Sequence, residues 1–186
     1  MQSTADAMLR SLVGSERSIR DRLRTMLDER EDLAGPHPPH VMRDFMPILG
    51  KFGDLSNAVN FKVLVDHVCR FVERNQVPWT NKHGRPIKFP RVNIFNTAYN
   101  SCERFLSTRQ SSGGDQPLEG KIRLLSVFDA IMNFYVKANG KRVWMCKSMG
   151  MSKFHDTLLD FYGKKRLRYI YLVRDPRDVA MSFMKT

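Results

Sequence analysis

The order of elements in the last quarter of the chain predicts an α/β protein, with a parallel sheet flanked by helices. Arg142–Cys146 is a short apolar run, and Tyr169–Val173 is a nearly continuous apolar run typical of a buried parallel strand. Ser152–Tyr162 lies between them as a helix ending at Gly163. This order gives two parallel strands joined by a right-handed helical crossover. Helical patterns dominate the rest of the chain, so we expect the fold to be helix-rich. The 186 residues are 42% hydrophobic and can bury one sizeable core, which predicts a single domain over residues 1–186.

Helical spacing marks the first part of the chain. Apolar residues recur at three- and four-residue intervals over 8–13 and 19–27, so we expect two helices separated by Gly14. Residues 35–40 read Gly-Pro-His-Pro-Pro-His and predict a non-helical connector, because proline removes backbone donors and restricts its neighbours. A short helix follows near Val41–Leu49, limited by Pro47.

The middle of the chain carries two strong amphipathic patterns. The first predicts a helix capped by Asn60, with apolar positions at 61, 64, 65, 68, 71 and 72. The second predicts a helix stopped by Asn139-Gly140, with apolar positions at 124, 125, 128, 131, 132 and 135. Between them, Val77–Pro90 is expected to be a loop, Arg91–Phe95 a short strand, and Ser107–Gly120 a mobile surface loop.

Charge and composition narrow the function classes. The net charge is +12, and Lys141–Thr186 holds eleven lysines and arginines against four aspartates. This excess suits an anionic ligand such as a nucleotide phosphate, a sulfated sugar or a nucleic acid, although a solvated basic face that only confers solubility fits it equally. Three widely spaced cysteines show no disulfide framework and no metal-ligand spacing. We therefore expect a reducing compartment and no metal.

Targeting signals are not visible in the sequence. No run of about 18 apolar residues exists, so we expect no membrane span. The N-terminal residues lack the basic-then-apolar order of a secretory signal. The expected location is cytoplasmic.

A phosphate site is predicted where the second strand passes into the last helix. Asp175 suits the N-cap position, Pro176 the first helical position, and Asp178 completes a capping-box pattern. A helix N-terminus at the carboxyl end of a parallel strand presents free N–H groups and a favourable dipole to an anion. Arg174 leaves the strand end with a guanidinium able to hold a phosphate through two hydrogen bonds.

Three further residues extend this site. Ser182 on the following helix can add a hydroxyl donor, and the first strand ends at Lys147 and Ser148. Carboxyl ends of parallel strands share one crevice, so we expect these groups to converge there. Each also has a simpler explanation: Arg174 can pair with Asp178 or Asp160, and Ser182 and Lys147 can be ordinary exposed residues.

The segment Arg174-Asp-Pro-Arg-Asp-Val-Ala-Met-Ser182 resembles the sulfotransferase signature R-(N/D)-P-x-D-x-x-x-S. In that family the Arg and the Ser bind the 3′-phosphate of the donor 3′-phosphoadenosine 5′-phosphosulfate (PAPS). Trp144-Met-Cys-Lys147-Ser148 is similar to the W-x-x-K-S strand end of the same family, and residues 37–40 are weakly similar to a segment near its acceptor side. The resemblance implies a P-loop NTPase-like fold, PAPS as co-substrate, and a small-molecule or glycan acceptor. It covers Arg142–Thr186 well.

One family hallmark is missing, the N-terminal strand–loop–helix that cradles the 5′-phosphosulfate. We therefore expect the chain to be a partial sulfotransferase domain. The resemblance implies transfer of a sulfuryl group to a hydroxyl or amine, with Lys147 suited to stabilising charge. His37, His40 and His155 are possible bases, but none has a diagnostic spacing, so no catalytic residue is assigned.

Two other functions remain open. One is a nucleotide-phosphate-binding module without chemistry. The other is a basic nucleic-acid-binding protein. Nucleic acid is not the expected partner, because the basic residues are predicted to flank a buried strand and not to interleave with exposed aromatic side chains.

Overall fold

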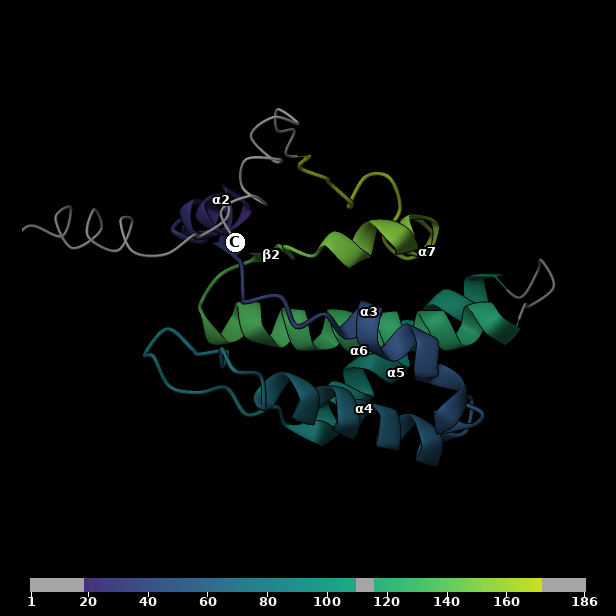
Figure 1. Ribbon diagram of the computed structural model, residues 1–186. Coiled ribbons are helices and arrows are strands. Elements are labelled where there is room, and N and C mark those ends of the chain that lie inside the picture. The colour runs from purple at the N-terminus through teal and green to yellow at the C-terminus, as the bar shows by residue number, and fades with distance from the viewer. Residues whose placement is uncertain (1–18, 110–115, 172–186) are drawn as a thin grey trace, which may run out of the picture.

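The computed structural model describes residues 19–109 and 116–171 as a helix-rich fold around a two-stranded parallel sheet (Figure 1). The prediction of a helix-rich fold is confirmed, and the small parallel sheet is compatible with the predicted α/β class. The helices are α2 (Ile19–Asp28), α3 (Val41–Phe45), α4 (Ala58–Glu73), α5 (Arg91–Arg109), α6 (Gln116–Ala138) and α7 (His155–Tyr162), with 3₁₀ helices η1 (Met46–Phe52) and η3 (Met149–Phe154). The strands are β1 (Leu33–Ala34) and β2 (Val143–Trp144).

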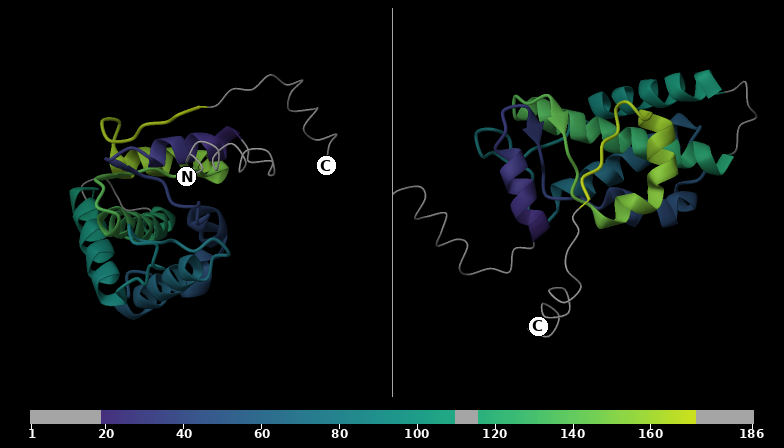
Figure 2. Two further views of the ribbon diagram at one scale, coloured as in Figure 1. Left: turned by 90° about the vertical axis from the view of Figure 1, so that its left-hand side faces the viewer. Right: turned by 90° about the horizontal axis from the view of Figure 1, so that it is seen from above.

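Helix α6 forms the centre of the fold. It packs against α4 and α5 on one side and against the strands and α7 on the other (Figures 1 and 2). Its predicted core residues, Leu124, Leu125, Phe128, Ile131 and Met132, are all buried, and Tyr135 is nearly so. The helix ends before Asn139, and Gly140 takes the left-handed backbone that commonly follows a helix end (φ 67°). This prediction is confirmed.

Helix α4 exists as predicted but begins three residues earlier. Asn57, and not Asn60, is its N-cap, and the Asn57 side chain accepts a hydrogen bond of 2.8 Å from the Val59 N–H. The Asn60 side chain instead donates to the Asp54 carbonyl at 2.9 Å. Phe71 was predicted to be buried but is 36% exposed. The sequence offers two asparagines, Asn57 and Asn60, as N-caps of this helix. The geometry of the preceding turn decides that Asn57 is the cap.

The predicted strand Arg91–Phe95 is wrong, because these residues form the first turn of α5. Ile94, Ala98 and Cys102 are buried at four-residue spacing, a helical period along a helix that packs on α6. Arg91 fixes this start by donating from Nη1 and Nη2 to the two carboxylate oxygens of Glu73, each at 2.8 Å. Long-range packing thus overrides the local preference of a short β-branched run.

The predicted loop Ser107–Gly120 is largely helical. Residues 107–109 belong to α5 and residues 116–120 to α6. Residues 110–115 lie outside the described part of the chain. The two helices therefore extend into both ends of the segment that was predicted to be a loop.

The strand predicted at Arg142–Cys146 forms, but with another partner. Val143 pairs with Leu33 and Trp144 with Ala34, in parallel. The Val143 N–H donates to the Asp32 carbonyl (2.9 Å), and the Met145 N–H donates to the Ala34 carbonyl (2.9 Å). Strand β1 was not predicted, since two residues before Gly35 carry too little pattern.

The predicted buried strand Tyr169–Val173 is wrong over its described residues. Residues 169–171 form no strand and are 37, 67 and 76% exposed. After α7 ends, Gly163 adopts a positive φ of 73°, and the chain turns through 164–166 and runs away from helices α4–α6 (Figure 2). The described part of this apolar run therefore lies outside the sheet, whose two strands are β1 and β2. Leu172 and Val173 lie outside the described residues.

The remaining predictions near the sheet are confirmed. Residues 35–40 form a non-helical connector, and α3 and η1 follow it with Pro47 in the first turn of η1. Helix α7 ends at Gly163 as expected. Over the described ranges, none of the helices has the length and apolar character needed to cross a membrane.

Candidate functional site

The site is built where the two parallel strands end. Strand β1 continues directly into the connector 35–40, and β2 continues into Met145–Ser148. Since the strands are parallel, both continuations leave the sheet at the same edge. The structure therefore places Lys147 and Ser148 at the carboxyl edge of a sheet, although the partner strand is β1.

Ties from α2 hold the two strand ends together. The Gly35 N–H donates to Asp28 Oδ1 (2.8 Å), and Arg24 Nη1 donates to the Gly35 carbonyl (2.6 Å). Lys141 Nζ reaches the same Asp28 carboxylate at 3.1 Å. A Cβ on Gly35 would lie 2.3 Å from Met145 Cε, so a larger residue here would displace the flexible Met145 side chain.

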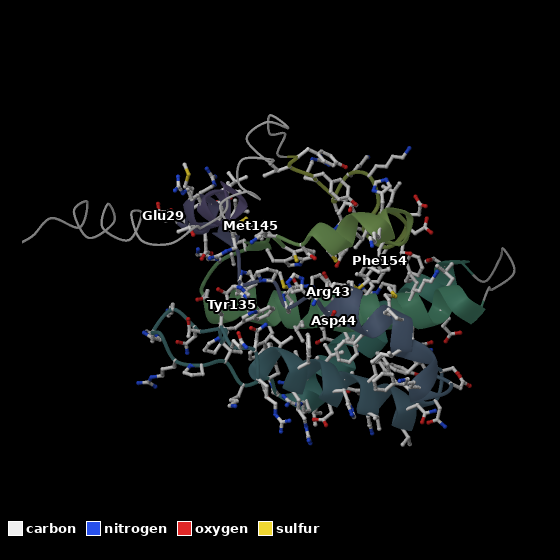
Figure 3. The ribbon with its side chains drawn as sticks, in the orientation of Figure 1. Glu29, Arg43, Asp44, Tyr135, Met145 and Phe154 are labelled. Carbon is white, nitrogen blue, oxygen red and sulfur yellow. The ribbon has the colours of Figure 1, made fainter. Side chains whose placement is uncertain are left out.

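Helix α3 and the residue before it, His40, lie beside the two strand ends. His40 precedes this helix with a left-handed backbone (φ 54°, ψ 20°), the one non-glycine residue with positive φ among those described. Helix α3 packs against η3, where the Cβ position of Gly150 lies 3.4 Å from Arg43 Cβ and 3.9 Å from Ser148 Oγ. Figure 3 shows Arg43 between α3 and the layer that carries Met145 and Phe154.

The surroundings of His40 disfavour its charged form. Burial lowers the pKa of His40, and the positive charges of Arg43 and Lys147 lower it further against the opposing effect of Asp44. Its Nδ1 is buried and has no hydrogen-bond partner among the described residues. Such an atom costs free energy in the folded state unless a water or a ligand pairs with it.

Arg43 brings a second charge to this edge. Its Nε donates to Asp44 Oδ1 (2.5 Å) and its Nη2 to Asp44 Oδ2 (2.9 Å). The pair is more than half exposed on the arginine side, so it contributes little to stability and can rearrange. Together, Arg43, Lys147 and Ser148 supply two cations and a hydroxyl, which are groups that bind an oxyanion.

A polar cluster lies beneath this edge and supports it. The Tyr162 hydroxyl donates to Asp129 Oδ1 (2.9 Å) and Asn133 Nδ2 donates to Asp129 Oδ2 (2.8 Å). Burial raises the pKa of Asp129, and it raises the pKa of the Cys146 thiol to about 12. Cys146 is therefore a packed thiol and not a nucleophile.

The predicted site residues divide into two groups. Lys147 and Ser148 lie at the carboxyl edge of the sheet, and Lys147 is close enough to His40 to lower its pKa. Arg174 and Ser182 lie outside the described residues, so their convergence with Lys147 stays a prediction.

The other histidines named from the sequence differ from His40. His155 lies on α7, where its Nδ1 is 2.9 Å from the Tyr169 hydroxyl. His37 lies in the connector, and its carbonyl accepts a 2.8 Å hydrogen bond from Trp79 Nε1. Its role is to hold the connector on the loop before α5.

Arg43 was missed from the sequence. No motif contains it, and it enters the site only because α3 packs on η3. Over residues 19–109 and 116–171, no three histidine, cysteine or acidic side chains gather as metal ligands would.

Comparison with known proteins finds no match for this chain among protein-family models, curated proteins or solved structures.

Proposed function

We propose that this chain is a part of a sulfotransferase that transfers a sulfuryl group from PAPS to a hydroxyl or amine acceptor. The observation that supports this best is the position of Lys147 and Ser148 at the carboxyl edge of a parallel strand pair, beside His40 and Arg43. This is where ligands bind in open α/β sheets. The same two residues end the segment that resembles the sulfotransferase W-x-x-K-S strand end. A P-loop NTPase-like fold is part of the proposal.

The cationic side chains at this edge of the sheet suit sulfuryl transfer. An in-line transfer develops negative charge on the transferring group and on the departing phosphate, and fixed cations stabilise both. In this proposal, Lys147 and Arg43 stabilise the negative charge on the transferring group. Arg174 and Ser182 take the 3′-phosphate, as the signature implies.

A second candidate is a phosphate-binding module without chemistry. The observation that favours it is the segment before β1. This segment carries no sequence that resembles the family's strand and Gly-rich loop for the 5′-phosphosulfate. The two candidates share the 3′-phosphate site and differ in turnover.

Calorimetry with adenosine 3′,5′-bisphosphate tests both. Arg174→Ala removes a charge-assisted contact worth about 1.5–3 kcal/mol, so we expect binding to weaken by roughly tenfold to over a hundredfold. Lys147→Ala should weaken binding less, because its charge is directed to the transferring group. Lys137→Ala, on the exposed face of α6, is the matched control and should leave binding unchanged.

Equal binding by wild type and Arg174→Ala would refute the assignment of the 3′-phosphate site. Turnover separates the two candidates. Release of the bisphosphate from PAPS in the presence of 2-naphthol or 2-naphthylamine indicates the enzyme, and binding without release indicates the module.

A further inference from the structure

The segment Lys164–Tyr171, which follows α7, is a basic and aromatic surface that the proposed function does not use. Lys164, Lys165, Arg166 and Arg168 are exposed, and residues 161–171 contain no acidic side chain. Tyr169, Ile170 and Tyr171 are exposed at 37, 67 and 76%. We call these eight residues the basic–tyrosine segment.

The two tyrosine rings of this segment lie side by side. Their centroids are 5.8 Å apart and their planes are inclined by 33°. Tyr169 is held to α7 through its hydroxyl, which lies 2.9 Å from His155 Nδ1, and the two rings are 5.4 Å apart. Tyr171 stands beside this anchored ring and is the more exposed of the two. The pair is thus positioned before any ligand arrives, which lowers the entropy cost of binding.

The cations are arranged at the turn that precedes the rings. Arg168 Nη1 donates to the carbonyls of Lys164 (2.9 Å) and Leu167 (3.0 Å), which fixes the turn. Arg166 lies over the Tyr162 ring at 6.0 Å. Lys164 and Lys165 project from the same turn as exposed side chains. Four cations therefore precede the exposed rings in the chain, while burial and the carboxylate of Asp156 on α7 raise the pKa of Tyr169.

We propose that the basic–tyrosine segment binds single-stranded nucleic acid, with successive bases stacking on Tyr169 and Tyr171 and the phosphates attracted to Lys164 and Lys165. Cationic grooves joined to aromatic stacking platforms are how proteins hold single strands without reading their sequence. The net charge of +12 favours the same partner. This proposal takes Tyr169–Tyr171 as the exposed residues that the structure describes, and not as the strand before Arg174 that the sulfotransferase resemblance implies.

The structure also removes the sequence argument against nucleic acid. That argument took Tyr169 and Tyr171 to be buried in a strand, and both are exposed. A sulfated glycan would meet the same charges but has no flat bases that require a pair of rings. An anionic membrane would require a broader apolar face than Ile170 offers. Both are outcomes of the test.

Fluorescence anisotropy with a labelled oligouridylate and a labelled oligothymidylate tests the proposal. Stacking on an aromatic ring is worth about 1–3 kcal/mol per base, so Tyr171→Leu should weaken binding by roughly 5- to 150-fold while Tyr171→Phe keeps it. Leucine keeps the apolar bulk and removes only the aromatic face. Tyr171 is 76% exposed, so we expect both substitutions to leave the fold unchanged, and thermal unfolding checks this.

Salt dependence tests the charge contribution. Each phosphate contact adds about 0.7 to the slope of log K against log salt for a single strand, so Lys165→Gln should reduce the slope by about that amount. Lys137→Gln, exposed on α6, is the control and should change neither the slope nor the affinity.

Equal affinity of wild type and Tyr171→Leu would overturn the proposal, as would a failure of both oligonucleotides to bind in about 50–200 mM salt. Heparin or phosphatidylserine vesicles bound in place of the oligonucleotides, with the same dependence on Tyr171, would assign the surface to another polyanion and also overturn it.

Discussion

The bundle of α4, α5 and α6 and the sheet layer that carries β1, β2 and α7 are built on different principles. In the bundle, apolar side chains are buried on three helices, and a partly buried cation such as Arg91 is matched by two hydrogen bonds to Glu73. In the sheet layer, the strands have two residues each, and His40 keeps a left-handed backbone and a buried Nδ1 without a partner.

The difference indicates where stability and function reside. Backbone strain lowers stability, so it persists where another requirement holds it in place. A buried nitrogen without a hydrogen-bond partner does not separate the two regions, because Arg123 Nη1 on α6 is also such an atom among the described residues. A bundle with filled core positions supplies the stability that the sheet layer lacks. Substitutions should therefore have opposite effects in the two regions.

The largest expected effect is at the centre of the bundle. Phe61 is fully buried, lies 5.6 Å from the Phe95 ring, and has the Arg123 guanidinium 5.5 Å above it. Phe61→Ala should reduce the free energy of unfolding by about 3–5 kcal/mol, from lost burial and the cavity that remains. Urea unfolding measures this. Val92→Ala, 70% exposed on α5, should stay within about 0.5 kcal/mol. A small loss at Phe61 would mean that the bundle is not the stable half.

The second effect is smaller and has the opposite sign. Glycine adopts a positive φ without a steric cost, whereas a side chain with a Cβ costs roughly 1–2 kcal/mol there. His40→Gly should therefore be at least as stable as wild type, and His40→Ala should be less stable than His40→Gly by about that amount.

Thermal unfolding of the two His40 variants beside wild type gives the comparison. Asparagine tolerates the left-handed region, so His40→Asn should fall between them. If all three variants lose stability equally, His40 holds the connector through contacts and not through a functional requirement.

The smallest effect concerns Asp129, which joins the two regions. Burial raises its pKa above the ordinary value of 3.8, so the folded state favours the protonated carboxyl more than the unfolded state does. Stability contributed by this group is therefore present below pH 3.8 and is lost as pH rises through the folded pKa.

Asp129→Asn should flatten that loss, because asparagine does not titrate. Urea unfolding of both proteins from about pH 4 upward checks the slope. Parallel curves for Asp129→Asn and wild type would contradict this prediction, because they would show that the pKa of Asp129 is the same in the folded and unfolded states.

Sequence patterns predicted the long buried helices well. Positions at three- and four-residue spacing in α4 and α6 describe one face of a helix whatever the partner is, and Gly140 and Gly163 end helices for local steric reasons. The position of Lys147 and Ser148 after a strand was predicted in the same way. Both conclusions rest on interactions within a few residues of each other.

The misplaced elements are short. Val92, Ile94 and Phe95 have β preference over five residues, but α5 continues to Arg109 and buries Ile94, Ala98 and Cys102 on a helical period. Strand β1 depends on ties from Asp28 and Met145, which no local pattern encodes. Short segments carry too little free energy of their own to resist what packs against them.

The sequence by itself thus determined the helical core, the connector 35–40, and the strand end that carries Lys147 and Ser148. Tertiary structure alone decided that β2 pairs with β1, that His40 and Arg43 join the strand end, and that Tyr169–Tyr171 is exposed. The reason is that a strand's apolar side chains and open backbone groups specify only that it needs partners. Which partner it finds depends on segments far away in the chain and on the free energy of the whole arrangement.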